Sequence, residues 1–165
     1  MTVDAGAHMF PALALWPARE PHGLLISNGL ASMGFALPAA IGAALLDGRP
    51  TTVLTGDGGL LLCLAELATA ARERLPLTIV VFEDRELSLI KVKQVQRGYR
   101  TEGVSLGNIN WPALSEALGV PARQAASERE LERCLTDTAG TGGPVLIAAR
   151  VDPTSYEPMM RALRG

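Results

Sequence analysis

Two runs of branched apolar residues constrain the fold of this chain more than any other feature. They lie at residues 51–58 (TTVLTGDG) and 77–84 (LTIVVFED), and a helical pattern over 60–74 separates them. Continuous apolar runs bounded by turn residues are typical of parallel strands that are buried on both faces. Strands that alternate with helices predict an α/β fold, a doubly wound parallel sheet with helices on both faces.

The rest of the chain extends this alternation. Asn110 is a candidate N-cap, and Ser127 followed by Glu130 resembles a capping box, so each is expected to begin a helix. Further strands are expected at 2–6, 23–27 and 144–151, and further helices at 32–46, 87–94, 111–118, 127–138 and 157–164.

Composition narrows the class of protein. A chain of 165 residues is expected to form a single domain, and 48% hydrophobic against 19% charged residues exclude a disordered chain. The formal net charge of −2 leaves no basic excess for a nucleic-acid backbone, so no nucleic-acid partner is expected. Cys63 and Cys134 form no CxxC pair and suit a reducing compartment. Because residues 1–20 also lack a secretory pattern, a cytoplasmic location is expected.

One segment raises the question of a membrane span. Residues 29–46 carry no charge over eighteen positions, which is near the lower length limit for a spanning helix. Gly34, Pro38 and Gly42 interrupt the segment, and Asp47 follows it without a basic flank. We therefore expect a deeply buried helix of a soluble domain, with no membrane partner.

Acidic residues follow both strong strands. Asp57 stands in a Gly-Asp-Gly-Gly loop directly after the first strand, and Asp84 ends the second. Ligands of parallel α/β sheets bind beyond the carboxyl ends of the strands, where neighbouring strands are about 4.8 Å apart. The two carboxylates are thus expected to meet over one Mg²⁺ ion, with phosphate oxygens as further ligands. From the residues alone, the alternative is that the Gly-Asp-Gly-Gly segment is a plain turn and the acidic cluster at the end of the second strand is a solvated loop.

Several motifs together resemble a known family. The stretches 3–9 (VDAGAHM), 25–50 (LISNGLASMGFALPAAIGAALLDGRP) and 56–94, from GDGG to IKVKQ, occur in the order found in thiamine diphosphate (ThDP)-dependent enzymes. The chain is similar to the C-terminal, diphosphate-binding domain of acetolactate synthase-like enzymes, and the similarity covers about residues 2–152. The resemblance implies the ThDP-binding domain fold over the whole of 1–165, with ThDP and Mg²⁺ as cofactors.

The resemblance also implies ligands for the metal and the diphosphate. Asp57 matches the metal-binding aspartate of the family's Gly-Asp-Gly motif, which begins here at Gly56. Asp84 matches the second position of the family's Asn-Asn pair, and the backbone carbonyl of Glu86 would complete the protein ligands. The remaining diphosphate contacts implied by the motif are the amides of Gly58 and Gly59.

The resemblance implies four more cofactor-binding residues. Met33 matches the bulky residue that lies under the cofactor and holds its V shape. Ala31 matches the position whose carbonyl accepts a hydrogen bond from the aminopyrimidine. His8 falls in the family's stretch near the diphosphate, and Leu89 is the last of the implied contacts.

Some positions depart from the family pattern. Glu83 replaces the usual first Asn, and Asp84 is the acidic variant of the metal ligand, which some family members share. Two carboxylates put more negative charge around one ion than Asp plus Asn would. Ala7 stands where many relatives have Gln. Lys93 stands where biosynthetic acetohydroxyacid synthases carry a Trp that favours the larger acceptor, so another acetolactate synthase-like activity is expected.

The largest departure is length. Complete relatives have three domains, and this chain matches only the last, without the pyrimidine-binding and middle domains. No residue matches the catalytic glutamate, which the family supplies from the pyrimidine-binding domain, so we assign no catalytic residue. We expect a ThDP- and Mg²⁺-binding domain for 2-oxo acid decarboxylation with acyl transfer, which associates with a pyrimidine-binding domain or into an oligomer. A subunit of a split 2-oxo acid decarboxylase and a noncatalytic scaffold that has lost the cofactor remain alternatives.

Overall fold

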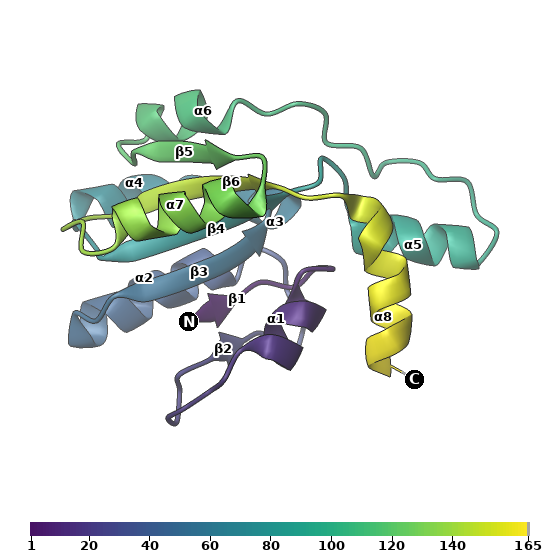
Figure 1. Ribbon diagram of the computed structural model, residues 1–165, viewed down its shortest axis with the longest axis horizontal. Coiled ribbons are helices and arrows are strands. Elements are labelled where there is room, and N and C mark those ends of the chain that lie inside the picture. Colours follow the sequence, from purple (N-terminus) through teal and green to yellow (C-terminus); the bar gives the residue numbers. More distant parts are fainter. Residues whose placement is uncertain (165) are drawn as a thin grey trace.

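The chain folds around one parallel sheet of six strands in the order β2-β1-β3-β4-β6-β5 (Figure 1). The computed structural model describes residues 1–164. The strands are β1 (Thr2–Val3), β2 (Leu25–Ile26), β3 (Thr51–Gly56), β4 (Leu77–Glu83), β5 (Ala122–Ala125) and β6 (Val145–Arg150). The helices are α1 (Met9–Leu15), α2 (Ala36–Asp47), α3 (Asp57–Leu62), α4 (Glu66–Arg72), α5 (Ser88–Gln96), α6 (Trp111–Ala117), α7 (Glu128–Thr138) and α8 (Tyr156–Arg164), with a 3₁₀ turn, η1, at Pro153–Ser155.

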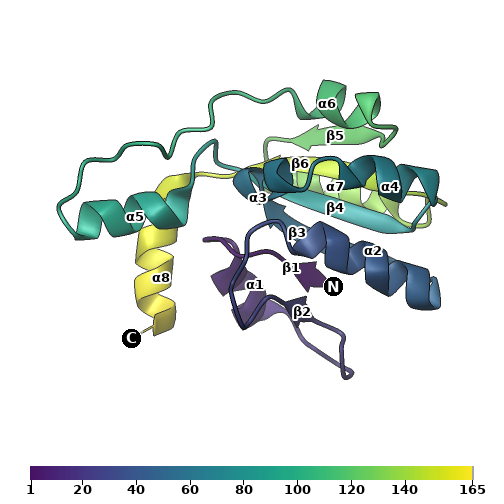
Figure 2. The same cartoon turned by 180° about the vertical axis from the view of Figure 1, so that it is seen from behind.

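Helices cover both faces of the sheet, which confirms the predicted doubly wound α/β class. Helices α2 and α4 lie on one face and α7 lies on the other, as the front and back views show (Figures 1 and 2). Helices α5 and α8 lie beyond the carboxyl ends of the strands, at the same end of the sheet as α1.

Register brings the strand ends level at the edge where the acidic residues follow. Strands β3 and β4 pair in parallel with Gly56 opposite Phe82, so Asp57 and Asp84 both stand just beyond the last paired residues. The central strands are buried, with Val53, Ile79 and Ile147 fully covered. A rigid double layer of packed side chains therefore supports the loops that leave this edge.

Helix α2 packs closely through small residues but is not deeply buried all round. Ala36, Ala40 and Ala44 recur at a spacing of four and are almost fully covered, which matches one face of a helix. The opposite face is open, since Leu46 is 87% exposed. The expectation of a deeply buried helix within 29–46 was wrong, because residues 29–35 form an irregular segment and only one face of α2 meets the sheet. The helix start predicted at residue 32 lies instead at Ala36.

Several predicted boundaries also differ from the structure. The helix predicted over 60–74 is two helices, α3 and α4, separated by a turn. The strands predicted at 2–6 and 23–27 are only two residues long. Helix α1 and strand β5 were missed, since α1 contains a proline and β5 (ARQA) is a polar strand at the sheet edge.

Both predicted N-caps are formed. The Asn110 side chain accepts a hydrogen bond from the Ala113 amide (3.1 Å), and Ser127 accepts one from the Glu130 amide (3.3 Å). Glu130 in turn accepts a bond from the Ala126 amide (2.8 Å). Within residues 1–164, no helix has both the length and the apolar character needed to cross a membrane.

A buried carboxylate that the sequence did not single out joins three parts of the fold. Asp4 is fully covered and accepts hydrogen bonds from the Gly34 amide (2.9 Å), the Phe35 amide (3.0 Å) and the Thr55 hydroxyl (3.0 Å). These bonds fix the turn before α2 and the end of β3 to the end of β1. They leave no room at Gly59, where an added Cβ would lie 2.0 Å from Asp4 Oδ2.

We predict that Gly59→Ala destabilises the domain by about 2–4 kcal/mol, because the methyl group displaces the Asp4 carboxylate from its buried partners. The measurement is the free energy of unfolding in urea. Gly42→Ala is the matched control, since Gly42 lies in α2 with nothing within 4 Å of an added Cβ, and a gain of about 0.5–1 kcal/mol is expected there. Equal effects of the two substitutions would contradict the role given to Asp4.

Candidate functional site: a cavity at the carboxyl ends of the strands

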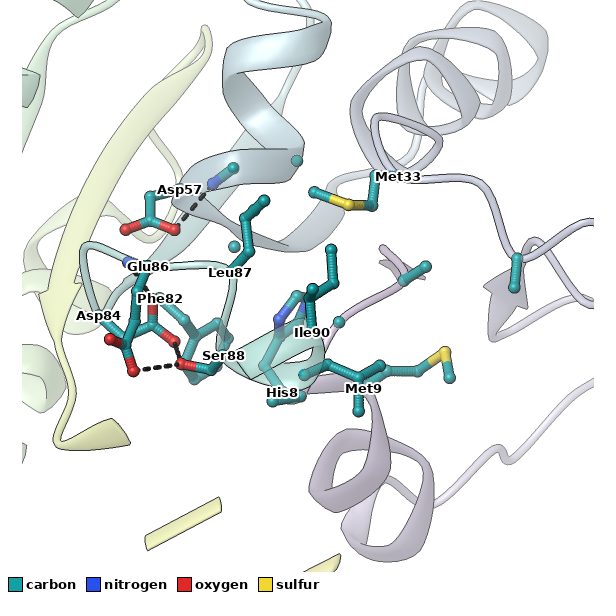
Figure 3. A pocket seen from close by; sticks show the side chains of 18 of the residues that line it. His8, Met9, Met33, Asp57, Phe82, Asp84, Glu86, Leu87, Ser88 and Ile90 are labelled. Carbon is teal, nitrogen blue, oxygen red and sulfur yellow. Dashed lines mark hydrogen bonds between the residues drawn. The ribbon is translucent and has the colours of Figure 1, made fainter. Parts of the chain in front are cut away.

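One cavity gathers every residue that the sequence singled out for cofactor or metal binding. It has a volume of about 270 Å³ and is lined by four segments of the chain, within 5–9, 31–33, 56–59 and 82–93 (Figure 3). The predicted residues that line it are His8, Ala31, Met33, Gly56, Asp57, Gly58, Gly59, Asp84, Glu86 and Leu89. Their placement is a structural fact, and their functions remain predictions.

Asp57 is held rigidly at the start of α3. Its carboxylate accepts hydrogen bonds from its neighbour, the Gly58 amide (2.8 Å), and from the Arg85 amide (2.7 Å). Burial, followed by the charge of Asp84, raises the pKa of Asp57 to about 6. A buried carboxyl group whose pKa is raised by burial and by a neighbouring carboxylate forms a site that a cation would stabilise.

The loop after β4 presents Asp84 to the same cavity as Asp57, whose carboxyl group is affected by the Asp84 charge (Figure 3). Arg85 adopts a left-handed conformation with φ of 65°, which turns the chain sharply between Asp84 and Glu86. Asp84 accepts bonds from the Glu86 amide (3.0 Å) and the Ser88 hydroxyl (2.6 Å), and burial raises the pKa of its carboxyl group. This loop is therefore locally closed by its own side chains.

A distant segment braces the same loop. The Leu87 amide donates to the Val104 carbonyl, and the Leu106 amide donates to the Arg85 carbonyl, both at 2.8 Å. This segment is an irregular part of the chain between α5 and α6, so no periodic hydrophobic pattern in the sequence indicated its role. The loop that carries Asp84 is thus fixed both by Asp57, through the Arg85 amide, and by the segment around Val104.

The Glu86 side chain is directed to other partners than the two aspartates. Its carboxylate pairs with the Lys91 ammonium group at 2.5 Å, one turn along α5. Among residues 1–164, no group of three or more His, Cys, Asp and Glu side chains is arranged to hold a metal by itself. A metal here would therefore need backbone and ligand oxygens besides Asp57 and Asp84.

Two glycines let neighbouring side chains pack closely against the backbone at the floor of the cavity. An added Cβ at Gly58 would lie 2.5 Å from Leu87 Cδ2 and 3.2 Å from Met33 Cε, and one at Gly56 would meet the His8 ring at 3.3 Å. The Gly58 amide already donates to Asp57, so its predicted contact with a diphosphate would compete with that bond.

The opposite wall is apolar. Met33 and Leu87 approach each other over Gly58, and Leu89 and Ile90 extend the wall along α5 (Figure 3). Ala31 holds a left-handed conformation with φ of 50°, which is uncommon for a residue with a side chain. The cavity therefore has an acidic end at the strands and an apolar end between the 31–33 segment and α5.

His8 places an unsatisfied nitrogen at this cavity. Its ring is 4% exposed, stacks on Phe82 with the ring centroids 5.3 Å apart, and has no hydrogen-bond partner at Nε2. Burial lowers the pKa of His8 to about 4, although the charge of Asp4 opposes the shift. A neutral, buried imidazole whose nitrogen lacks a partner is a feature that a bound ligand would complete.

The departures from the family pattern fall in different places. Glu83 does not line the cavity, and its carboxylate pairs with Arg85 Nε at 3.1 Å. Ala7 and Lys93 do line it. The Glu83 carboxylate is paired with Arg85, but its charge still contributes to the raised pKa of Asp57.

Tyr156 on α8 is a nearby residue that sequence reasoning missed. It is buried against Ala7, Leu89 and Val92, so α8 bridges the two walls of the cavity that come from residues 5–9 and from α5. Burial, with the charges of Asp84 and Asp57, raises the pKa of its hydroxyl group. The amphipathic pattern of the last helix was the one signal that could have indicated this packing.

We predict that neutral His8 makes stability depend on pH. Because its pKa is lowered on folding, the unfolded chain binds more protons between the pKa of about 4 and the ordinary value of 6.5. Its contribution is complete above pH 6.5, and on the order of 3 kcal/mol is lost as the pH falls towards 4. The measurement is the unfolding free energy of the wild type minus that of His8→Gln at several pH values. A difference that stays constant from pH 7 to pH 4.5 would rule out this role.

Comparison with known proteins identifies a family model that matches most of the chain. The family model described as "Thiamine pyrophosphate enzyme, C-terminal TPP binding domain" matches residues 4–149, and thiamine pyrophosphate is another name for ThDP. The chain is 35% identical over 158 residues to acetolactate synthase of Bacillus subtilis (strain 168), covering 92% of this chain and 27% of that protein. It is 33% identical over 157 residues to acetolactate synthase isozyme 1 large subunit of Escherichia coli (strain K12), covering 92% and 28%.

A plant relative gives the same picture. Acetolactate synthase 2, chloroplastic, of Nicotiana tabacum is 34% identical over 160 residues, covering 89% of this chain and 24% of that protein. The chain thus spans about a quarter of the length of these relatives. Since the family model covers most of the chain, the protein belongs to the thiamine pyrophosphate enzymes and corresponds to their C-terminal TPP-binding domain.

Proposed function

We propose that this chain binds ThDP and Mg²⁺ as the diphosphate-binding domain of an acetolactate synthase-like enzyme that acts on 2-oxo acids. The single observation that carries the proposal is the cavity itself, where residues from four segments gather around the buried Asp57 and the half-buried Asp84. A location in the cytoplasm and assembly with a further domain or into an oligomer are parts of the same proposal.

The acidic end of the cavity fits Mg²⁺. Asp57 and Asp84 supply oxygen ligands only, which suits a hard cation. Each carboxylate oxygen that already accepts an amide or hydroxyl bond keeps a second lone pair for a metal. The Glu86 carbonyl and the oxygens of a diphosphate would complete the coordination, in agreement with the lack of a third acidic ligand in the described residues.

The rest of the cavity fits ThDP. The partnerless His8 Nε2 belongs to a residue that lines the cavity, and the absence of a side chain at Gly58 lets Leu87 and Met33 lie against the backbone there. Met33, Leu87 and Leu89 give the apolar end a surface for rings. Bound ThDP supplies the carbanion and the electron sink for decarboxylation, while these residues orient it and keep water from the apolar end.

Decarboxylation needs one more group than the cavity offers. Activation of a bound ThDP would require an acid–base group positioned at its aminopyrimidine. Asp57 and Asp84 are committed to the metal in this proposal, and Glu86 is paired with Lys91. The missing glutamate would come from a pyrimidine-binding domain, on a longer chain or on a separate subunit.

Two other readings stay distinguishable. A split 2-oxo acid decarboxylase has the same site with the pyrimidine-binding domain on another chain. A noncatalytic scaffold would have lost cofactor binding, and Glu83 and Asp84 are the substitutions that favour it. The Glu83 carboxylate pairs with Arg85 and does not line the cavity, whereas Asp84 does line it, so the scaffold reading has to be decided by a binding experiment.

Calorimetric titration with ThDP and Mg²⁺ tests the binding site. We predict saturable binding by the wild type, and affinity lowered at least about tenfold in Asp57→Asn and in Asp84→Asn, since each removes a charged metal ligand. Asp137→Asn is the matched control, because Asp137 is exposed on α7 and removes the same charge away from the cavity. A wild type that does not bind would establish the scaffold reading.

We also predict that the chain alone does not consume pyruvate with ThDP and Mg²⁺, and that turnover appears when a ThDP pyrimidine-side domain is added. Disappearance of pyruvate is the measurement. Glu66→Gln serves as the control, since Glu66 begins α4 and does not line the cavity. Turnover by the chain alone that Glu66→Gln abolishes would show that the acid–base group lies in this domain.

A further inference from the structure

Lys93 is the basic side chain that remains free to meet an anion at the cavity. Among the described residues that line the cavity, it is the single lysine or arginine. The other lysine of α5, Lys91, is held by Glu86 at 2.5 Å, whereas Lys93 takes part in no ion pair within residues 1–164. Its charge is therefore available to a ligand.

Lys93 also lines a second groove that continues from the cavity. This groove has a volume of about 380 Å³ and lies between α5 and α8, which stand side by side in both views (Figures 1 and 2). Leu89 and Lys93 line both the cavity and the groove. They are one helical turn apart, so a ligand that extends from the cavity along α5 passes the lysine.

The groove combines an apolar lining with one uncompensated charge. Leu89, Val92 and Met160 supply the apolar surface. Of the other charged residues there, Arg161 is paired with Glu157 at 2.7 Å, so these two charges largely cancel. Among the described residues of the groove, the one charge left unpaired is the ammonium group of Lys93, at the point where the cavity meets the groove.

We propose that Lys93 binds a second acid group on the 2-oxo acid substrate, so that the substrate class is a 2-oxo acid with an anionic group at its far end. This inference rests on the function proposed above. The apolar residues beside Lys93 accommodate the aliphatic carbons between the two acid groups, and the lysine neutralises the distal charge.

The chemistry of decarboxylation favours the distal group over the reacting one. The reacting carboxylate leaves as neutral CO₂, with its electron pair passing to the carbon it leaves. A cation paired with that carboxylate would stabilise the substrate more than the transition state and would slow the step. An acid group that keeps its charge throughout can be bound by Lys93 without this cost.

Binding of two acids of equal chain length tests the proposal. The chain is first loaded with ThDP and Mg²⁺, and loading is measured separately. 2-Oxoglutarate and 2-oxovalerate, which differ in the distal carboxylate, are then titrated by calorimetry or by chemical-shift changes along α5. We expect 2-oxoglutarate to bind about fivefold more tightly at low salt, a preference typical of one partly exposed ion pair, and less so at high salt.

Matched variants identify the residue responsible. Lys93→Gln is expected to remove the preference and leave the affinity for 2-oxovalerate unchanged. Arg97→Gln, which removes the same charge one turn further along the helix and outside both cavities, should keep it. A loaded wild type that binds neither acid, binds both equally, or keeps its preference in Lys93→Gln overturns this inference alone. A wild type that fails to load overturns the proposed function, and this inference with it.

Discussion

The Asp4 carboxylate is the interaction on which the rest of the site depends. It is buried without a charged partner and is satisfied by two amides and a hydroxyl from segments that are thirty to fifty residues away. A buried carboxylate is tolerated only when such donors are in place, so the 34–35 turn and the end of β3 are held at fixed positions. Met33 and Gly59, which line the cavity, are the direct neighbours of these fixed points.

A second constraint acts at the acidic end. Asp57 and Asp84 are kept close although their charges repel, because backbone amides and the Ser88 hydroxyl hold each carboxylate in place. The loop that follows Asp84 is also paired with the segment around Val104. Hydrogen bonds from the backbone amides and from Ser88 offset the repulsion between the carboxylates, so the acidic end is organised before any cation arrives.

The sequence predicts the fold class and the positions of Asp57 and Asp84 from local patterns, whereas other cavity residues, such as His8 and Met33, were predicted only from the resemblance to ThDP-dependent enzymes. Apolar runs gave the central strands β3 and β4, and the Gly-Asp-Gly-Gly motif located the end of β3. Asp4, Tyr156 and the Val104 segment could not be predicted, since their importance lies in contacts between residues far apart in the chain. The break between α3 and α4 and the polar edge strand β5 were not predicted either, because tertiary packing outweighs local preference there.

The shortness of β1 has a consequence for the motions of the domain. The cavity wall at residues 5–9 continues from a strand of only two residues, which pairs with β2 and β3 through few hydrogen bonds. Local opening requires the fewest broken contacts at such an element, so amide protons of β1 should exchange with solvent sooner than those of β4. A ligand that bridges His8 and Asp57 would join this wall to the centre of the sheet, and the protection of β1 would then report occupancy of the cavity.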